Sequence, residues 1–219
     1  LVQAQLEAVF EDVAVAAVKI GMVANAGIAE AIAEVLARHR PPFVVFDPVM
    51  AASTNKRLMN ENDLERIRTA LLPQVSLLTP NLKEAARLLG IAQPVDEAGM
   101  RACLPALQAL GVPNVLLKGG HLADDTLDAP ESTDLLATPE GVIRLSAPRI
   151  ATRHGHGTGC TLSSAIAALW PQHGLEKATR MAKDYVHGAL LHADALQVGH
   201  GRGPLHHFWQ AVHLPGQLA

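Results

Sequence analysis

His156-Gly157-Thr158-Gly159-Cys160-Thr161-Leu162-Ser163-Ser164-Ala165-Ile166-Ala167-Ala168 joins a glycine-bracketed turn directly to an apolar helix of small residues. Glycine lets a backbone bend sharply, and Thr158 is suited to cap the helix. The first peptide N–H groups of a helix have no acceptor within it, and the helix dipole is positive there. We therefore predict that the turn binds a phosphate group. The alternative is an ordinary glycine-containing loop before a core helix.

Around this stretch, short β-rich runs alternate with amphipathic segments, a pattern typical of a parallel sheet covered by helices. Strands are expected over residues 15–20, 43–46, 75–78 and 115–118, and helices over 28–38, 62–72, 80–89, 161–173 and 175–196. Thr79 is expected to cap the helix over 80–89. Residues 133–137 and 142–145 predict an antiparallel hairpin at one edge. The fold class is therefore α/β, with a mostly parallel central sheet and helices on both faces.

Composition restricts the classes of partner. The 219 residues are 49% apolar and carry a net charge of −3 without a basic run, which argues for one domain over 1–219 and against nucleic-acid binding. We find no uninterrupted membrane-span pattern and no signal-peptide pattern at the start. Cys103 and Cys160 occupy different contexts, so a disulfide is not expected and the cytoplasm is the expected compartment. A small molecule is the expected partner.

Polar, glycine or proline residues recur where the proposed strands end. They are Gly21-Met22, Asp47-Pro48, Thr79-Pro80-Asn81 and Lys118-Gly119-Gly120. In open parallel sheets, ligands bind at the carboxyl ends of the strands. We therefore expect these residues to surround a single crevice.

These motifs carry a family resemblance. Residues 18–22, 47–50, 78–81 with Glu84, 117–122, 134–136 and 156–168, and in some members also 199–208, resemble the ordered motifs of the hydroxymethylpyrimidine/phosphomethylpyrimidine kinases. That family has a ribokinase-like fold and acts in thiamin biosynthesis. The resemblance implies ATP-dependent phosphorylation of 4-amino-5-hydroxymethyl-2-methylpyrimidine, then of its monophosphate to the diphosphate. It also implies Mg²⁺ and a homodimer.

Four polar side chains suit phosphoryl transfer by their chemistry, and for Lys118 the family pattern adds a role. Asp47 and Glu84 offer oxygen ligands for Mg²⁺, directly or through water. Lys118 would pair with ATP phosphate oxygens, and Asn81 would bind phosphate or metal-bound water. The alternatives are a solvated capping carboxylate for Glu84, a surface lysine at a strand exit for Lys118, and purely local hydrogen bonds for Asn81.

The turn itself supplies the other expected catalytic groups. Gly157, Thr158 and Gly159 would provide backbone donors, and the last two would also bind the nucleotide phosphates. Cys160 stands where sugar kinases of this fold carry a carboxylate base. The pKa of its thiol is expected to fall at the helix N-terminus, so that a thiolate could act as base. We rank the backbone donors above the thiol, because the second acceptor is a phosphate that needs little deprotonation.

By family pattern, Met22 and Val49 would line the pyrimidine pocket, although plain core packing competes strongly for Val49. A metal site built from His206, His207 and His213, or from His154 and His156, is disfavoured, because no carboxylate or cysteine nearby completes a tetrahedral set. His121 and His156 belong to motifs, and the sequence does not assign their roles.

The sequence departs from the family pattern at its beginning. Family members start with a strand and a Gly-Ser-Asp and Gly-Gly-Ala-Gly type segment, whereas this sequence opens on Leu1 in a helical pattern. We therefore expect that N-terminal strands and part of the substrate pocket are missing. In the phosphate-binding turn, His154-Gly155 replaces the usual Asn-Thr pair.

Two other functions remain open. Pyridoxal kinases share the fold and the Gly-Thr-Gly turn, but Met22 and the Thr79-Pro80-Asn81 context favour the pyrimidine kinase. The second alternative is a non-catalytic, regulatory pyrimidine-binding module, against which intact Asp47, Lys118 and Cys160 argue.

Overall fold

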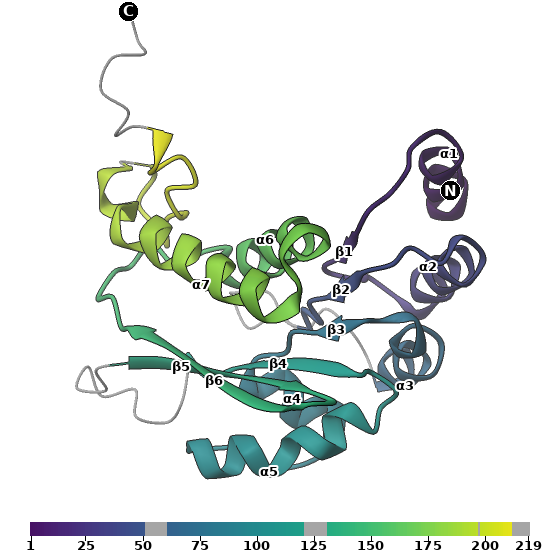
Figure 1. Cartoon of the computed structure of the whole chain (residues 1–219), viewed down its shortest axis with the longest axis horizontal. Helices are drawn as coiled ribbons and strands as arrows, with labels where there is room; N and C mark the ends of the chain where they lie inside the picture. The colour runs from purple at the N-terminus through teal and green to yellow at the C-terminus, as the bar shows by residue number, and fades with distance from the viewer. Residues whose placement is uncertain (51–60, 121–130, 197, 212–219) are drawn as a thin grey trace, which may run out of the picture.

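A computed structural model describes residues 1–50, 61–120, 131–196 and 198–211. Within these ranges, six strands form one sheet in the order β1-β2-β3-β4-β5-β6 (Figure 1). The parallel strands are β1 (Val18–Ile20), β2 (Val44–Phe46), β3 (Leu77–Leu78) and β4 (Asn114–Lys118). An antiparallel hairpin of β5 (Glu131–Thr138) and β6 (Gly141–Pro148) completes the sheet. The predicted mostly parallel sheet with an antiparallel edge is confirmed.

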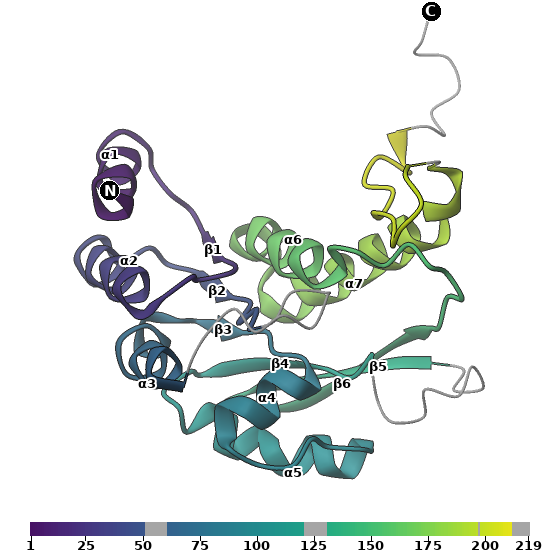
Figure 2. The ribbon, with the colours of Figure 1, turned by 180° about the vertical axis from the view of Figure 1, so that it is seen from behind.

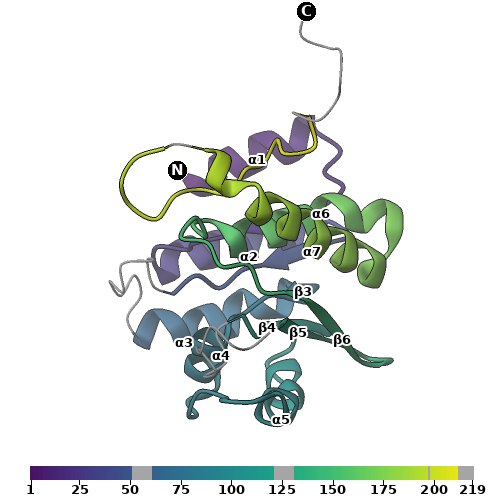
Figure 3. The same ribbon diagram turned by 90° about the vertical axis from the view of Figure 1, so that its left-hand side faces the viewer.

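Helices cover both faces of the sheet, as predicted (Figures 2 and 3). One layer holds α2 (Ala26–His39), α3 (Glu61–Ala70), α4 (Leu82–Leu89) and α5 (Glu97–Gln108), with α1 (Val2–Asp12) against α2. The other face carries α6 (Thr158–His173) and α7 (Leu175–Leu191). Short 3-10 helices cover Leu72–Gln74 and Ala193–Ala195. Among the helices in the described ranges, none has the length and apolar character needed to cross a bilayer.

The sheet divides the core into two clusters. Successive strand residues point to opposite faces, so Phe46 packs among α2, α3 and α4 while its neighbour Val45 packs under α6 and α7. On β4, Leu117 and Leu116 divide in the same way. Burial on both faces explains why these strands are continuously apolar rather than alternating.

The start of α4 differs from the sequence-based expectation. Asn81, not Thr79, is the N-cap, because its side-chain oxygen accepts from the N–H of Glu84 at 2.9 Å. Thr79 still extends β3, and its N–H donates to the carbonyl of Phe46 at 2.9 Å. A residue committed to a neighbouring strand cannot cap the helix that follows, so the prediction for Thr79 was wrong.

Candidate active site

A buried ion pair lies where β2 and β4 end. Lys118 Nζ donates to Asp47 Oδ1 at 2.7 Å, and the two side chains are 15% and 2% exposed. The hydroxyl of Thr79, at the end of β3, donates to the same oxygen at 3.3 Å. The carboxyl ends of three parallel strands therefore converge on one carboxylate, as the crevice argument predicted.

The N-terminus of α6 begins with a left-handed glycine. Gly157, with φ of 87°, is the N-cap, and no side chain caps the helix. Thr158 is instead the first helical residue, and its hydroxyl donates to the carbonyl of Gly155 at 2.8 Å. The capping role predicted for Thr158 was therefore wrong. Within the helix, the N–H of Thr161 donates to the carbonyl of Gly157, so the three amides before it have no helical acceptor.

Gly159 brings this helix start against the ion pair. A Cβ atom on Gly159 would lie 3.1 Å from Lys118 Nζ and 3.7 Å from Asp47 Oδ2. A side chain at this position would therefore crowd the ammonium group. The lysine and the first amides of α6 present their donors to the same space, where several of them can bind one phosphate.

Asn81 and Glu84 form a capping box. Glu84 Oε2 accepts from the N–H of Asn81 at 2.7 Å, and the Asn81 side chain accepts in return. Burial raises the pKa of Glu84 to about 7, although the charge of Lys118 opposes the shift and Asp47 adds to it. Glu84 is thus a capping carboxylate, but a buried one that is only 8% exposed rather than a solvated one.

The thiol of Cys160 behaves differently from the prediction. Partial burial raises its pKa, the charge of Lys19 and Lys118 lowers it, and the Asp47 carboxylate raises it by charge and by a hydrogen bond. The expected fall of this pKa at the helix N-terminus was therefore wrong. Desolvation and a neighbouring negative charge outweigh the helix dipole, so the thiol is predominantly neutral near pH 7.

Lys19 is a site residue that the sequence reasoning missed. It lies in β1, and its Nζ is 2.8 Å from the position that a Cβ on Gly21 would occupy. Its charge also reaches Cys160. The strand was interpreted only as a buried apolar run, yet a lysine within such a run was the available signal.

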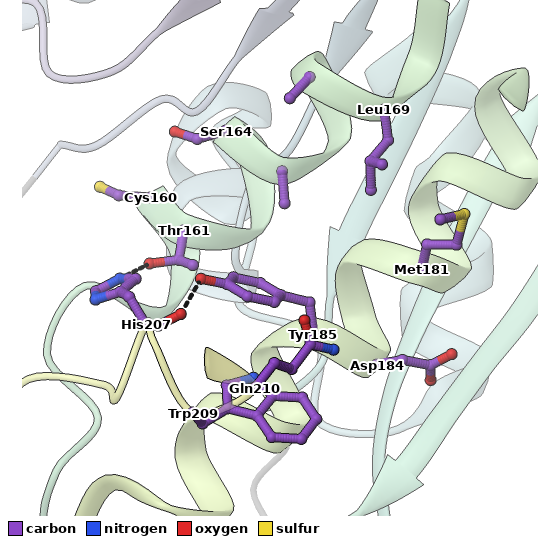
Figure 4. A pocket seen from close by; sticks show the side chains of 12 residues that line it. Cys160, Thr161, Ser164, Leu169, Met181, Asp184, Tyr185, His207, Trp209 and Gln210 are labelled. Carbon is purple, nitrogen blue, oxygen red and sulfur yellow. Dashed lines mark hydrogen bonds between the residues drawn. The ribbon is translucent and has the colours of Figure 1, made fainter. Parts of the chain in front are cut away.

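The two residues expected to contact the pyrimidine differ in exposure. Met22 is 59% exposed, so it is not a core residue, whereas Val49 is half-buried and its N–H donates to the carbonyl of Asp47 at 2.8 Å. A separate pocket of about 830 Å³ lies between α6, α7 and residues 207–210 (Figure 4). It reaches Cys160, but neither Met22 nor Val49 lines it.

The C-terminal histidines anchor the last described segment. The ring of His207 shares a hydrogen bond with the Thr161 hydroxyl at 3.0 Å, and the N–H of His206 donates to the carbonyl of Ala189. The N–H of His156 donates to the carbonyl of Gly203, which ties this segment to the turn. His121 and His213 lie outside the described residues. Within the described ranges no three His, Cys, Asp or Glu side chains form a metal-binding group.

Comparison with known proteins decides the family. Residues 1–206 match the family described as phosphomethylpyrimidine kinase. The chain belongs to this family.

Relatives of this phosphomethylpyrimidine kinase family member agree in sequence and in fold. The hydroxymethylpyrimidine/phosphomethylpyrimidine kinase of Salmonella typhimurium is 49% identical over 208 residues, covering 94% of this chain and 76% of that protein. The crystal structure of an ADP complex of Bacillus subtilis pyridoxal kinase aligns with a TM-score of 0.84 at 27% identity, covering 96% of this chain and 76% of the other. Phosphomethylpyrimidine kinase from Clostridium difficile aligns with a TM-score of 0.71 at 32% identity, covering 85% and 74%. The expected ribokinase-like fold is confirmed.

The close approach of Gly159 to Lys118 gives a testable prediction. Gly159→Ala should lower kcat/KM for ATP by roughly 10-fold or more, because the added methyl displaces the ammonium and narrows the space for phosphate. Gly201→Ala is the matched control, since a Cβ there meets nothing within 4 Å. Initial rates of ADP formation measure both variants. Equal rates for the two would show that the approach is unimportant.

The buried carboxyl of Glu84 predicts a pH-dependent stability. In the unfolded chain its pKa returns to the ordinary value of 4.5, so between about pH 4.5 and 7 the folded state binds more protons and loses stability as pH rises. Glu84→Gln removes this loss. Relative to the variant, the wild-type free energy of unfolding should fall by up to about 3 kcal/mol from pH 4.5 to 8. The free energies of unfolding of both proteins are measured by urea titration across this pH range. An equal pH dependence of the two would contradict the prediction.

Proposed function

We propose that this chain is an ATP-dependent kinase of thiamin biosynthesis. It phosphorylates 4-amino-5-hydroxymethyl-2-methylpyrimidine and then converts the monophosphate to the diphosphate. The observation that carries the proposal is the Lys118–Asp47 ion pair beneath the N-terminus of α6. Family membership and 49% identity to a kinase of that name support the choice of substrate.

In this proposal the transferred phosphoryl group is bound by fixed donors. Phosphoryl transfer depends on positioning and charge neutralisation more than on covalent chemistry. The backbone N–H groups of Thr158, Gly159 and Cys160 face the γ-phosphate, Gly157 provides the turn, and Lys118 neutralises the charge that develops. The ADP complex of the Bacillus subtilis relative supports ATP as the donor.

Mg²⁺ is part of the proposal, and Asp47 fits it. Mg²⁺ in kinases is bound by one or two carboxylates together with substrate phosphates, and Asp47 is a carboxylate beside the phosphate-binding lysine. The ion would neutralise phosphate charge during transfer. Glu84 and Asn81 already bond to each other in the capping box, which favours an indirect role for both, through water or by orienting the start of α4.

Cys160 is proposed to act only when the acceptor is an alcohol. Partial burial raises the pKa of its thiol, and Asp47 is close enough for its carboxylate to raise that pKa further, which leaves little thiolate near pH 7. A neutral thiol near a carboxylate can still take up the hydroxyl proton while it passes its own proton to Asp47, whereas a phosphate acceptor needs no such help. Met22 and Val49 are proposed to contact the pyrimidine ring. We further propose one domain over 1–219, a homodimer and a cytoplasmic location.

Pyridoxal kinase is the second candidate activity, because a pyridoxal kinase aligns with a TM-score of 0.84. Its sequence identity of 27% is well below the 49% shared with the pyrimidine kinase, so the pyrimidine is favoured. A non-catalytic pyrimidine-binding module is the third candidate. The buried ion pair argues against it, since a protein without phosphoryl-transfer activity has no need for a desolvated lysine at a phosphate site.

A coupled ADP-release assay separates these candidates. The purified protein should turn over hydroxymethylpyrimidine with a higher kcat/KM than pyridoxal, and Lys118→Ala should lower the rate by roughly 10- to 100-fold through loss of a charge-assisted contact. Higher kcat/KM with pyridoxal would support the second candidate. Pyrimidine binding without ADP release would support the third.

Cys160→Ala tests the proton role, because alanine has no proton to relay. Single-turnover rates should fall for hydroxymethylpyrimidine and change little for its monophosphate, because only the alcohol must lose a proton that it holds at neutral pH. The monophosphate reaction of the same variant is the internal control. If both steps slow equally, the thiol has a structural role instead.

A further inference from the structure

A second, largely buried ion pair includes Asp134, the strand partner of Lys118. Asp134, in β5, accepts from Lys183 Nζ of α7 at 2.6 Å through Oδ2. Its other oxygen, Oδ1, accepts from the backbone N–H of Gly119 at 3.0 Å. The side chains of Asp134 and Lys183 are 8% and 12% exposed. One carboxylate therefore joins three elements: the end of β4, strand β5 and helix α7.

Gly119 is held tightly at this point. A Cβ on Gly119 would lie 2.2 Å from the carbonyl oxygen of Thr133 and 2.9 Å from Met100 Cε, so the backbone is pressed onto β5. One residue earlier, the N–H of Lys118 donates to the carbonyl of Pro80 at 2.9 Å. The peptide units on both sides of Lys118 are thus fixed, the second of them by Asp134.

This arrangement sets the direction of the Lys118 side chain. Lysine has a flexible four-carbon stem, so the position of its ammonium depends on how firmly its backbone is held. Lys118 and Asp134 form the last residue pair in the register of β4 with β5. Beyond it the regular ladder ends, and the Asp134 side chain supplies the acceptor that a strand would otherwise provide for Gly119.

The charge of Asp134 also needs compensation. An unpaired carboxylate beside Lys118 would attract that ammonium and repel the phosphates of an incoming nucleotide. Lys183 neutralises it from the far side, by a bond to the oxygen that does not hold Gly119. The pair therefore keeps the acceptor for Gly119 while cancelling its charge.

We propose that the Asp134–Lys183 ion pair is a positioning device for phosphoryl transfer, which fixes Gly119 and thereby directs Lys118 toward the nucleotide phosphates. The inference rests on the proposed kinase function and adds two positioning residues to it. Neither residue is required to touch the substrate. Lys183 came from no motif of the sequence analysis, and Asp134 was noted there without a role.

The test separates the effect of the Asp134 charge from the effect of its hydrogen bond to the N–H of Gly119. Lys183→Met leaves Asp134 charged and unpaired, so KM for ATP should rise about 10-fold or more while KM for the pyrimidine stays unchanged. Asp134→Asn combined with Lys183→Met removes both charges but keeps a carbonyl acceptor for Gly119. This double variant has no unpaired buried charge, so it should fold, and its KM for ATP should return to within about threefold of wild type. Asp134→Ala with Lys183→Met lacks the acceptor and should show no such rescue.

Arg180→Met is the matched control. It lies on the same helix, and its ion pair with Glu176 is exposed. If the wild-type protein releases ADP but the Lys183 and Asp134 variants have the same two KM values as this control, the positioning role is overturned. Equal KM values for ATP in the Asn and Ala double variants would overturn it as well. A wild-type protein without ADP release would instead contradict the proposed function, so the two failures are distinguishable.

Discussion

The burial of Asp47 with Lys118 is the constraint on which the rest of the site depends. Removing an isolated ion from water costs several kcal/mol, so each partner requires the other, and Asp47 also accepts from Thr79. The N-terminus of α6 adds a positive dipole beside both groups. That dipole stabilises Asp47 and repels Lys118. A multiply charged phosphate would relieve the repulsion, because it attracts the ammonium and the helix amides together.

The charges of Asp47 and Lys118 influence the protonation of two nearby acidic groups, the Glu84 carboxyl and the Cys160 thiol. Glu84 is buried, whereas Cys160 is an exposed residue whose thiol is only partly desolvated. The loss of solvent raises the pKa of both groups, and the negative charge of Asp47 adds to the rise, because it opposes a further negative charge nearby. The positive charge of Lys118 lowers the pKa of both groups, and that of Lys19 lowers the pKa of Cys160, but neither cancels the rise. Near neutral pH the Cys160 thiol therefore keeps its proton and Glu84 is only partly ionised, so less negative charge opposes the binding of an anionic ligand.

Sequence patterns predicted the sheet, its helical layers and the convergence of strand ends. These features follow from local geometry, which places apolar runs in strands and helices and polar, glycine or proline residues where they end. Sequence patterns failed where a partner distant in sequence decided the outcome. Thr79 does not cap α4, because its N–H is bonded to the carbonyl of Phe46 in β2. The pKa of Cys160 rises through desolvation and through the charge of Asp47, which is distant in sequence. Lys183 could not be found from the sequence, since its partner Asp134 is 49 residues away and neither spacing nor periodicity links them.

The strand order of the sheet has a consequence for synthesis of the chain. Among the strands of the described ranges, each lies beside the one made just before it, from β1 to β6. These strands can therefore be added one after another at the same edge as the polypeptide leaves the ribosome. Asp47 and Lys118 are both in place once β4 has been added. The helix that supplies the anion-binding amides is made later, after β6. The ion pair of the site can therefore form first, and the phosphate-binding amides of α6 are added only after β6.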